Sequence, residues 1–409
     1  MVFDLVIVGA GAAGHFAASE LLNLKPEARI LMLEKTGQVL AKVRISGGGR
    51  CNVTHHCFDN ARLLDHYPRG NPWLRDVFSQ FSVKDTISWF KARGVRIVAE
   101  PDGRMFPESN QSESIIRALS SFTEGRKPEI RLHSQVDNIG TSPDGRFSIS
   151  LKSGEQISAR HILLASGGSP GTGGMQYLSG LKLKQVPPVP SLFTFNVKNH
   201  PWTALMGLAA EDALVSISGS GHSFRGPVLV THWGFSGPAI LKTSAAAALI
   251  LHAADYRFEF QLDFLPDEPQ HTVFVKLSEQ AKLNARQKPL NTKLFGLPRR
   301  LWEQLCTESG LAAYHNWAET GKKSLQAMAG LIKDRKFQAS GKTTFKEEFV
   351  TAGGIALDEV NPMTCESLRH PGLFFAGEIL DVDGFTGGFN FQAAWSTAFS
   401  ASREISGRI

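Results

Sequence analysis

Three glycines and one glutamate near the start of the chain have the types and spacing that dinucleotide binding requires. Gly9-Ala10-Gly11-Ala12-Ala13-Gly14 directly follows the apolar run 4–8, and an Ala- and Leu-rich stretch, 12–24, comes next. A second apolar run at 29–33 ends in Glu34, so the pattern predicts strand, glycine turn, helix, strand and acid. The glycines allow a tight turn, approach of a pyrophosphate and close helix packing, while the carboxylate can bind a ribose. The residues therefore predict an adenine dinucleotide, FAD or NAD.

The C-terminal end of the chain favours FAD over NAD. The run 371–378 predicts a buried strand that ends in a glycine turn, and the loop 381–388 leads into a helix predicted from about 390 to 405. The backbone at Gly377 and Glu378 suits the ribityl–phosphate part of a flavin. The positive end of the following helix suits the pyrimidine end of the isoalloxazine, where it stabilises the anionic reduced form. A plain strand–helix connection is the alternative.

A glycine-rich loop, Ser46–Asn52, follows Glu34 after about a dozen residues. Its glycines allow a ligand to approach the backbone closely, and Arg50 supplies a positive charge. The position favours a loop that wraps the cofactor over a plain surface loop.

The residues beside this loop raise two further hypotheses, both of which the sequence disfavours. Cys51 and Cys57 superficially resemble the redox-active pair of flavin disulfide reductases, but their spacing is longer than usual and no second dinucleotide fingerprint for NADPH is visible. His55, His56 and Cys57 are candidates for a metal site, but no second ligand pair with zinc spacing appears. We therefore expect neither disulfide chemistry nor a metal.

The composition indicates a multidomain enzyme of the cytoplasm. A chain of 409 residues predicts two or three domains, and no apolar run reaches the roughly 20 residues of a membrane span. Asp4 interrupts the apolar stretch at the N-terminus, so no signal peptide is visible. Four irregularly spaced cysteines fit a reducing compartment. The net charge is +6, but the basic residues are dispersed, which favours a solvated surface over a nucleic-acid partner.

The order of the predicted elements indicates an α/β fold whose nucleotide-binding domain is discontinuous. Continuous apolar runs such as 161–165 predict buried parallel strands, and they occur towards both ends of the chain. A cluster of prolines at 187–190 indicates a boundary, after which strand-like runs are followed by helical sequence. We therefore expect a Rossmann-like domain built from 1–188 and 346–409. The segment 189–345 is expected to be an inserted β-rich domain that carries a helical portion.

Three side chains are candidates for proton transfer or substrate anchoring. Arg104 lies in the compact turn 102–107 and is suited to anchoring an anion or a carbonyl group. His232 lies in the predicted insertion and is an acid–base candidate, although a packed, hydrogen-bonded histidine is the commoner case. Tyr177 is the third candidate. The pattern alone does not choose among them.

Together these motifs resemble one family, the BaiN-type FAD-dependent oxidoreductases, also labelled the aminoacetone oxidase family. The shared motifs span nearly the whole chain in order: Gly9–Gly14 with Glu34, Ile45–Asn52, Gly103–Pro107, Thr231-His232 with Ser236–Pro238, Val350–Gly354 with Glu359–Pro362, and Phe375–Glu378 with Asp381–Gly384 and Gly387–Asn390. The pieces SGGGRCN and GGFN are the most specific. The chain departs from the family pattern at His15, where a small or aliphatic residue is commoner, and at Ser166, where threonine is usual.

The resemblance implies a glutathione-reductase-type FAD domain and, with the motifs above, a set of FAD-binding residues. These are Gly9, Gly11, Ala12, Ala13, Gly14, Glu34, Lys35, Lys42, Ser46, Gly47, Gly48, Gly49, Arg50, Cys51, Asn52, Val136, Ala165, Ser166, Gly167, Gly168, Gly377, Glu378, Asp383, Gly388, Phe389, Asn390, Phe391 and Gln392. We expect hydride transfer at the flavin, with NADH or NADPH as a transient donor and an activated C=C bond of a small molecule as the leading substrate. The alternatives are a flavin that acts as a sensor or structural element for a partner, and an RNA-modifying flavoenzyme. The oligomeric state stays open.

Overall fold

The computed structural model describes residues 2–122, 126–142, 144–169, 171–343 and 350–409, and the chain divides into two compact units. One unit consists of Met1–Ser191 together with Lys346–Ile409, and the other is Leu192–Phe345. The first unit is therefore built from both ends of the sequence. The prolines at 187–190, interpreted above as a boundary, lie inside this first unit, in strand β10 (Gln185–Pro190).

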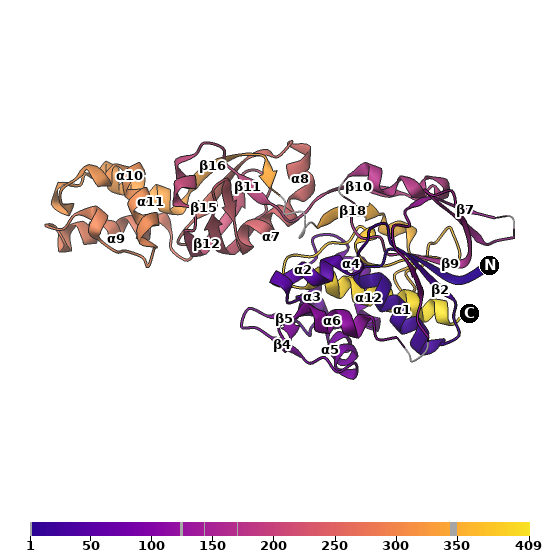
Figure 1. Ribbon diagram of the computed structural model, residues 1–409. Coiled ribbons are helices and arrows are strands. Elements are labelled where there is room, and N and C mark those ends of the chain that lie inside the picture. Colours follow the sequence, from indigo (N-terminus) through magenta and orange to yellow (C-terminus); the bar gives the residue numbers. More distant parts are fainter. Residues whose placement is uncertain (1, 123–125, 143, 170, 344–349) are drawn as a thin grey trace. The chain divides into compact units, whose positions relative to one another are not determined.

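The first unit is organised around a mainly parallel sheet (Figure 1). Its strands are β1 (Val2–Val8), β2 (Ile30–Leu33), β6 (Glu129–Arg131), β7 (Val136–Thr141), β8 (Phe147–Leu151), β9 (Gln156–Leu164) and β19 (Leu373–Phe375). The order is β6-β2-β1-β9-β8-β7, and β19 pairs with the carboxyl end of β9. All pairs are parallel except those of the β7–β8 hairpin and its junction with β9. β2 is buried along its whole length, which explains its continuous apolar sequence.

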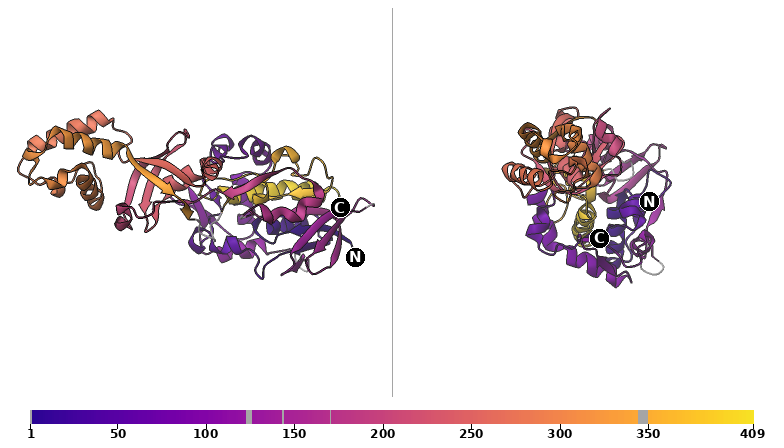
Figure 2. Two further views of the ribbon diagram at one scale, coloured as in Figure 1. Left: turned by 90° about the horizontal axis from the view of Figure 1, so that it is seen from above. Right: turned by 90° about the vertical axis from the view of Figure 1, so that its left-hand side faces the viewer.

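Helices pack around this sheet. Two of them, α1 (Ala12–Leu24) and α12 (Phe389–Ser406), begin next to the predicted cofactor site and pack on each other. The other helices are α2 (Ala41–Gly49), α3 (Asn60–Leu64), α4 (Asn71–Gln80), α5 (Val83–Ala92) and α6 (Ser112–Leu119). Figure 2 shows α12, in yellow, passing through the middle of the unit, and Phe16 of α1 meets Trp395 of α12 with ring centroids 5.6 Å apart. The helical stretch that begins at Asn71 is divided into α4 and α5, because Ser82 and Asp85 make a capping box that starts a second helix.

Short elements complete the first unit. β3 (Thr54–His55), β5 (Arg104–Pro107) and β4 (Ile97–Ala99) form a small sheet, and β10 pairs with β18 (Thr351–Ile355). The 3₁₀ segments η1 (Thr172–Leu181) and η7 (Gly377–Ile379) follow β9 and β19. The segments that follow the parallel strands β1, β2, β9 and β19 therefore start at the same edge of the sheet, although they come from different parts of the sequence.

The second unit contains a seven-stranded antiparallel sheet of order β16-β15-β12-β13-β14-β11-β17, which confirms the β-rich character expected of the insertion. Its strands are β11 (Thr194–Asn196), β12 (Ala209–Ile217), β13 (Ser223–Val230), β14 (Gly234–Ser236), β15 (Arg257–Asp263), β16 (Arg335–Ser340) and β17 (Lys342–Thr343). Its helices are α7 (Pro238–Ala246), α8 (Ala248–Ala253), α9 (Gln270–Leu283), α10 (Arg299–Ser309) and α11 (Lys322–Lys333). Stacked aromatic rings, among them Phe260 and Phe337, fill the core. Within the described residues, no helix has the length and apolar character needed to cross a membrane.

Candidate functional site

The turn between β1 and α1 has the geometry that the glycine pattern predicts. Gly9 has a φ angle of +108°, and a Cβ atom there would lie 2.4 Å from the backbone oxygen of Ala165. A Cβ on Gly14 would lie 2.2 Å from the backbone oxygen of Gly9, so only glycine lets α1 approach β1 this closely. A Cβ on Gly11, by contrast, would meet nothing within 4 Å beyond its chain neighbours. Gly11 therefore borders open space at the start of α1.

The start of α1 is suited to a diphosphate. The first N–H groups of a helix have no intrahelical acceptor, and here Ala12 and Ala13 provide them. No acidic residue lies in this first turn to oppose an anion. Gly377, from the far end of the sequence, packs against the same turn, since a Cβ there would lie 3.2 Å from the Cβ of Ala13. The N-terminal fingerprint and the C-terminal glycine turn thus belong to one site.

Glu34 is held beside this turn at the carboxyl end of β2. Its Oε2 atom accepts a hydrogen bond from the backbone N–H of Ala10 at 3.1 Å, and its Oε1 atom accepts from the N–H and the hydroxyl of Thr36 at 2.9 and 2.8 Å. These bonds fix the carboxylate where dinucleotide-binding folds hold a ribose. Val136 comes into the same region, because its near neighbour Ser134 donates its N–H to the backbone oxygen of Glu34 at 2.8 Å. Lys35 is exposed.

The first part of the segment Ser46–Asn52 is the distorted end of α2, which the structure closes at Gly49, and the remaining residues follow the helix. Gly47, Gly48 and Gly49 have φ angles of +58°, +70° and +84°, a run of left-handed backbone that favours glycine. Arg50 then pairs with Glu100 at 2.6 Å, and its guanidinium carbon lies 3.9 Å from the centre of the Phe106 ring. The charge of Arg50 is therefore already partnered, so the glycine backbone is the part of this segment that is open to a ligand.

The two cysteines of this region are not poised for redox chemistry. Cys51 is fully buried, and burial raises the pKa of its thiol to about 12. Burial and the neighbouring Asp59 carboxylate raise the pKa of Cys57. Both thiols are free, and neither has the lowered pKa of a reactive thiolate. In the described part of the chain, no three His, Cys, Asp or Glu side chains lie close enough together to hold a metal ion.

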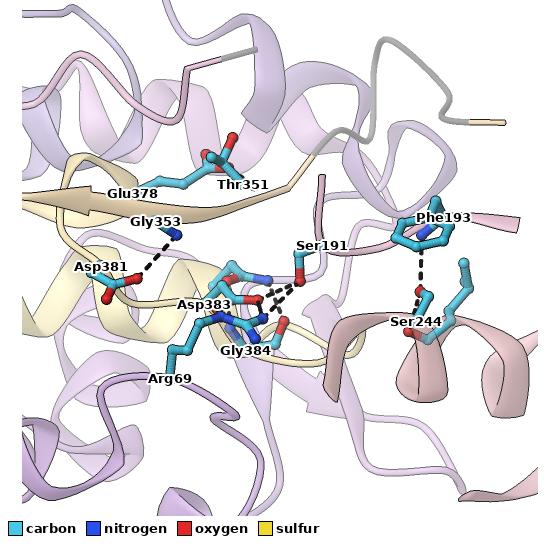
Figure 3. Close-up of polar contacts among 12 residues, drawn as sticks. Arg69, Ser191, Phe193, Ser244, Thr351, Gly353, Glu378, Asp381, Asp383 and Gly384 are labelled. Carbon is cyan, nitrogen blue, oxygen red and sulfur yellow. Dashed lines mark hydrogen bonds and ion pairs between the residues drawn. The ribbon is translucent and has the colours of Figure 1, made fainter. Parts of the chain in front are cut away.

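Glu378 joins three distant parts of the chain. Its Oε2 atom pairs with the ammonium group of Lys42 at 2.7 Å, and its Oε1 atom accepts a hydrogen bond from the backbone N–H of Thr351 at 2.9 Å. Figure 3 shows the glutamate beside Thr351. Gly168 lies against the same carboxylate, because a Cβ there would come within 2.6 Å of Oε1. Gly167, which precedes it, has a φ angle of +75°. The predicted residues 42, 167, 168 and 378 are therefore brought together.

Asp383 forms a buried ion pair with a residue that the sequence analysis did not select. Its side chain is fully buried, and both carboxylate oxygens accept hydrogen bonds from the guanidinium group of Arg69 (Figure 3). The hydroxyl of Ser191 also donates to this carboxylate, and Arg69 Nη2 lies 3.2 Å from the same hydroxyl. Burial raises the pKa of Asp383, and the charge of Arg69 opposes this shift. The aspartate is thus occupied in holding the loop 381–388 in place.

A glycine and an asparagine fix the start of α12 against the preceding loop. Gly388 has a φ angle of +94° and begins the helix. The side-chain amide of Asn390 accepts a hydrogen bond from the N–H of Gly384 at 2.8 Å and donates one to its carbonyl oxygen at 2.9 Å. No acidic residue lies in the first turn of α12. This second helix start is therefore also suited to negative charge.

The larger side chains of this turn serve mainly to anchor it. Phe389 is buried, and Phe391 stacks on Trp395 with ring centroids 5.4 Å apart. Gln392 is fully buried, and its amide oxygen accepts a hydrogen bond from the hydroxyl of Thr54 at 2.6 Å. The side chain of Gln392 is thus committed to the protein interior, which leaves the backbone as the part of this turn that can meet a cofactor.

The three catalytic candidates have different surroundings in the structure. Arg104 pairs with Asp102 at 2.7 Å. The Tyr177 hydroxyl lies 3.0 Å from the hydroxyl of Ser166, which follows β9, and burial raises the pKa of Tyr177 to about 12, so it stays protonated. His232 is exposed and belongs to the second unit. Within the first unit, no hydrogen bond or ion pair of the described residues joins Arg104 to Tyr177.

His15 gives a pH-dependent prediction for stability. It is buried in α1, and desolvation lowers its pKa from the ordinary value of 6.5 to about 4. Between these values the unfolded chain binds a proton that the folded chain does not, so stability falls as the pH drops through this range. We expect the free energy of unfolding to lose on the order of 3 kcal/mol between pH 7 and pH 4 from this group. Urea denaturation of the protein and of His15→Gln across this range measures the difference, and parallel curves would refute it.

The site as a whole fits FAD. Open space borders Gly11, two helix starts lack acidic residues in their first turns, and a fixed carboxylate stands at the end of β2. These groups match the pyrophosphate, the flavin ring and the ribose of one extended dinucleotide.

The sequence of the chain is similar to those of known proteins over nearly its whole length. Residues 3–404 match the family described as HI0933-like protein Rossmann domain. The ribosomal RNA dihydrouridine synthases of Haemophilus influenzae and Escherichia coli are 30% and 28% identical to the chain, with 98% of each protein covered. The 3-dehydro-bile acid delta(4,6)-reductase of Clostridium scindens is 27% identical with the same coverage. The similarity therefore includes both units.

Proposed function

The chain belongs to the HI0933-like family and is an FAD-dependent oxidoreductase, and from this premise we propose that it reduces the carbon–carbon double bond of uracil in ribosomal RNA. Two similar proteins are named dihydrouridine synthases, and dihydrouridine is uridine whose ring double bond is saturated. The third is named as a reductase of a 3-dehydro-bile acid. Both names describe the saturation of a double bond conjugated to a carbonyl group, which is the reaction class that the family resemblance implies.

In this proposal the described residues bind and orient the cofactor. The start of α1 beside Gly11 would hold the pyrophosphate, Glu34 would accept hydrogen bonds from the ribose, and the start of α12 would stabilise negative charge on the flavin. When bound and reduced by NADH or NADPH, the cofactor would supply hydride chemistry, in which one carbon of the double bond gains the hydride and the other gains a proton from water. The ion pair of Glu378 with Lys42 holds the N-terminal and C-terminal parts of the site together.

Ribosomal RNA is favoured over a small molecule because two similar proteins that match over their full length carry that substrate in their names. A small-molecule enone is the second candidate, and the similarity to the bile-acid reductase supports it. The family resemblance implies a small molecule, and basic residues that are dispersed along the sequence disfavour a nucleic-acid partner.

Two measurements on the purified protein test the proposal. Anaerobic stopped-flow mixing with NADH and then NADPH should bleach the flavin band with one of them, whereas a flavin that acts only as a sensor should not be reduced quickly. The reduced enzyme is then incubated with ribosomal RNA from a strain that lacks its gene, and the nucleosides are analysed by mass spectrometry. A gain of two mass units at one uridine is expected. Turnover of steroid-type enones without any dihydrouridine would contradict the RNA substrate and favour the second candidate.

A further inference from the structure

The positive charge of the protein is concentrated in one part of the second unit. Residues 192–345 hold 17 Lys and Arg but 12 Asp and Glu, so this unit carries +5 of the total charge of +6. Within it, residues 270–333, called here the helical segment, hold 10 basic and 4 acidic residues. The remainder of the unit is close to neutral. Figures 1 and 2 show the helices of this segment, α9, α10 and α11, gathered in orange at one end of the unit's sheet.

Most of these basic side chains are not neutralised. Lys276, Lys333 and Arg299 pair with acidic residues at 2.7, 2.6 and 2.8 Å. The remaining cations of the helical segment are exposed and form no ion pair with the described residues; they are Lys282, Arg286, Lys288, Lys293, Arg300, Lys322 and Lys323. The acid Glu308 is neutralised from outside the segment by Arg335 at 2.7 Å. The excess charge of the segment therefore faces solvent.

The fold gathers five of these cations at one end of the helical segment. The N–H groups of Trp317 and Ala318 bond the backbone oxygens of Gln287 and Ala285, both at 2.9 Å. These bonds place the chain that follows α9 beside the chain that leads into α11. The exposed cations in or next to these two stretches of chain are Lys282, Arg286, Lys288, Lys322 and Lys323. We call these five residues the basic end.

A rigid framework supports the basic end. Trp302 and Trp317, both in the helical segment, are almost fully buried in the core of the second unit. The indole N–H of Trp302 donates to the backbone oxygen of Pro289 at 2.9 Å, and that of Trp317 donates to the hydroxyl of Thr292 at 2.8 Å. The loop between α9 and α10 is thus fixed at two points. Cations on a fixed surface lose less conformational freedom on binding than cations on a mobile tail.

We propose that the basic end of the helical segment is a docking surface for the phosphate backbone of RNA, an inference that rests on the proposed function. Unpaired lysines and arginines on a rigid surface bind phosphates and release the counterions condensed on the nucleic acid. An anionic membrane is the less suitable partner, because membrane-binding helices also expose an apolar face. Within 270–333, all of which the structure describes, Leu283 is the one large apolar side chain that is exposed.

The test compares two variants with equal loss of charge. The first replaces the five lysines and arginines of the basic end by glutamine. The second replaces five exposed cations of the first unit that form no ion pair with the described residues: Arg62, Arg75, Lys84, Lys91 and Lys152. Filter binding to ribosomal RNA is measured between about 50 and 300 mM KCl. The first variant should lose affinity by about 30-fold or more. The slope of its log binding constant against log KCl concentration should become shallower by about three or more, whereas the second variant should stay close to the unmodified protein.

Separate readouts distinguish the docking surface from the proposed function. Reduction of the bound flavin by NAD(P)H should be unchanged in both variants, which also shows that they fold. If the unmodified enzyme forms dihydrouridine but both variants bind RNA equally well, the docking surface is refuted and the function stands. If the unmodified enzyme forms none, the proposed function fails. A loss of binding to phosphatidylglycerol vesicles without a loss of RNA binding would overturn the docking proposal in favour of a membrane.

Discussion

Replacing Gly11 by valine is expected to abolish FAD binding while the protein stays folded. The backbone at Gly11 is extended, with φ −91° and ψ −160°, so its negative φ angle does not require glycine. A Cβ there would meet no protein atom within 4 Å outside the chain neighbours, so the protein itself tolerates the side chain. The space that the valine would fill is the space that a pyrophosphate needs at the start of α1. We expect FAD affinity to fall by at least about 100-fold, equivalent to about 2.7 kcal/mol.

Gly140→Val is the matched control for this prediction. Gly140 lies in β7, has an ordinary φ angle and likewise has open space at its Cβ position. Absorbance of the bound flavin and isothermal titration with FAD measure binding, and circular dichroism measures folding. Gly140→Val should keep its flavin, and both variants should keep their helical signal. Full flavin occupancy in Gly11→Val would show that the cofactor does not pass over this turn.

The local part of the FAD site was predictable because short-range patterns determine it. The strand, the glycine turn and Glu34 lie within one stretch of about 30 residues, and the expected steric roles of Gly9 and Gly14 agree with the structure. The family resemblance supplied the distant pieces, but not their contacts. That Lys42 and Glu378 form an ion pair follows only from the fold, because 336 residues separate them.

Other features could not be read from the sequence for physical reasons. Arg69 looks like an ordinary surface cation until the fold places it against the buried Asp383. Arg50 was expected to supply charge to the cofactor, but Glu100 already pairs with it, and nothing in the local sequence indicates this. The excess positive charge of residues 270–333 is invisible to a search for consecutive basic residues, because its cations come from separate turns and helices that the fold gathers.

Arg69→Met is expected to destabilise the first unit by about 3–5 kcal/mol, because it leaves the carboxylate of Asp383 buried without its cation. Methionine matches the length of the arginine stem, so the lost charge is the main change. Arg62→Met is the control, since Arg62 is exposed and forms no ion pair with the described residues; it should change stability by less than about 0.5 kcal/mol. Removing both charges with Arg69→Met and Asp383→Leu should restore part of the loss. Urea denaturation measures all three variants.

The pH dependence of Arg69→Met separates a lost ion pair from lost packing. Burial already raises the pKa of Asp383 above its ordinary value, and Arg69 opposes this shift, so removing the arginine raises the pKa further. The folded variant then binds a proton that the unfolded chain releases, and such a group stabilises the fold at low pH and loses that effect as the pH rises. The destabilisation by Arg69→Met should therefore be smallest near pH 4 and grow towards pH 8. A destabilisation that is the same at every pH would mean that Arg69 holds the loop 381–388 through packing, and that its charge contributes little.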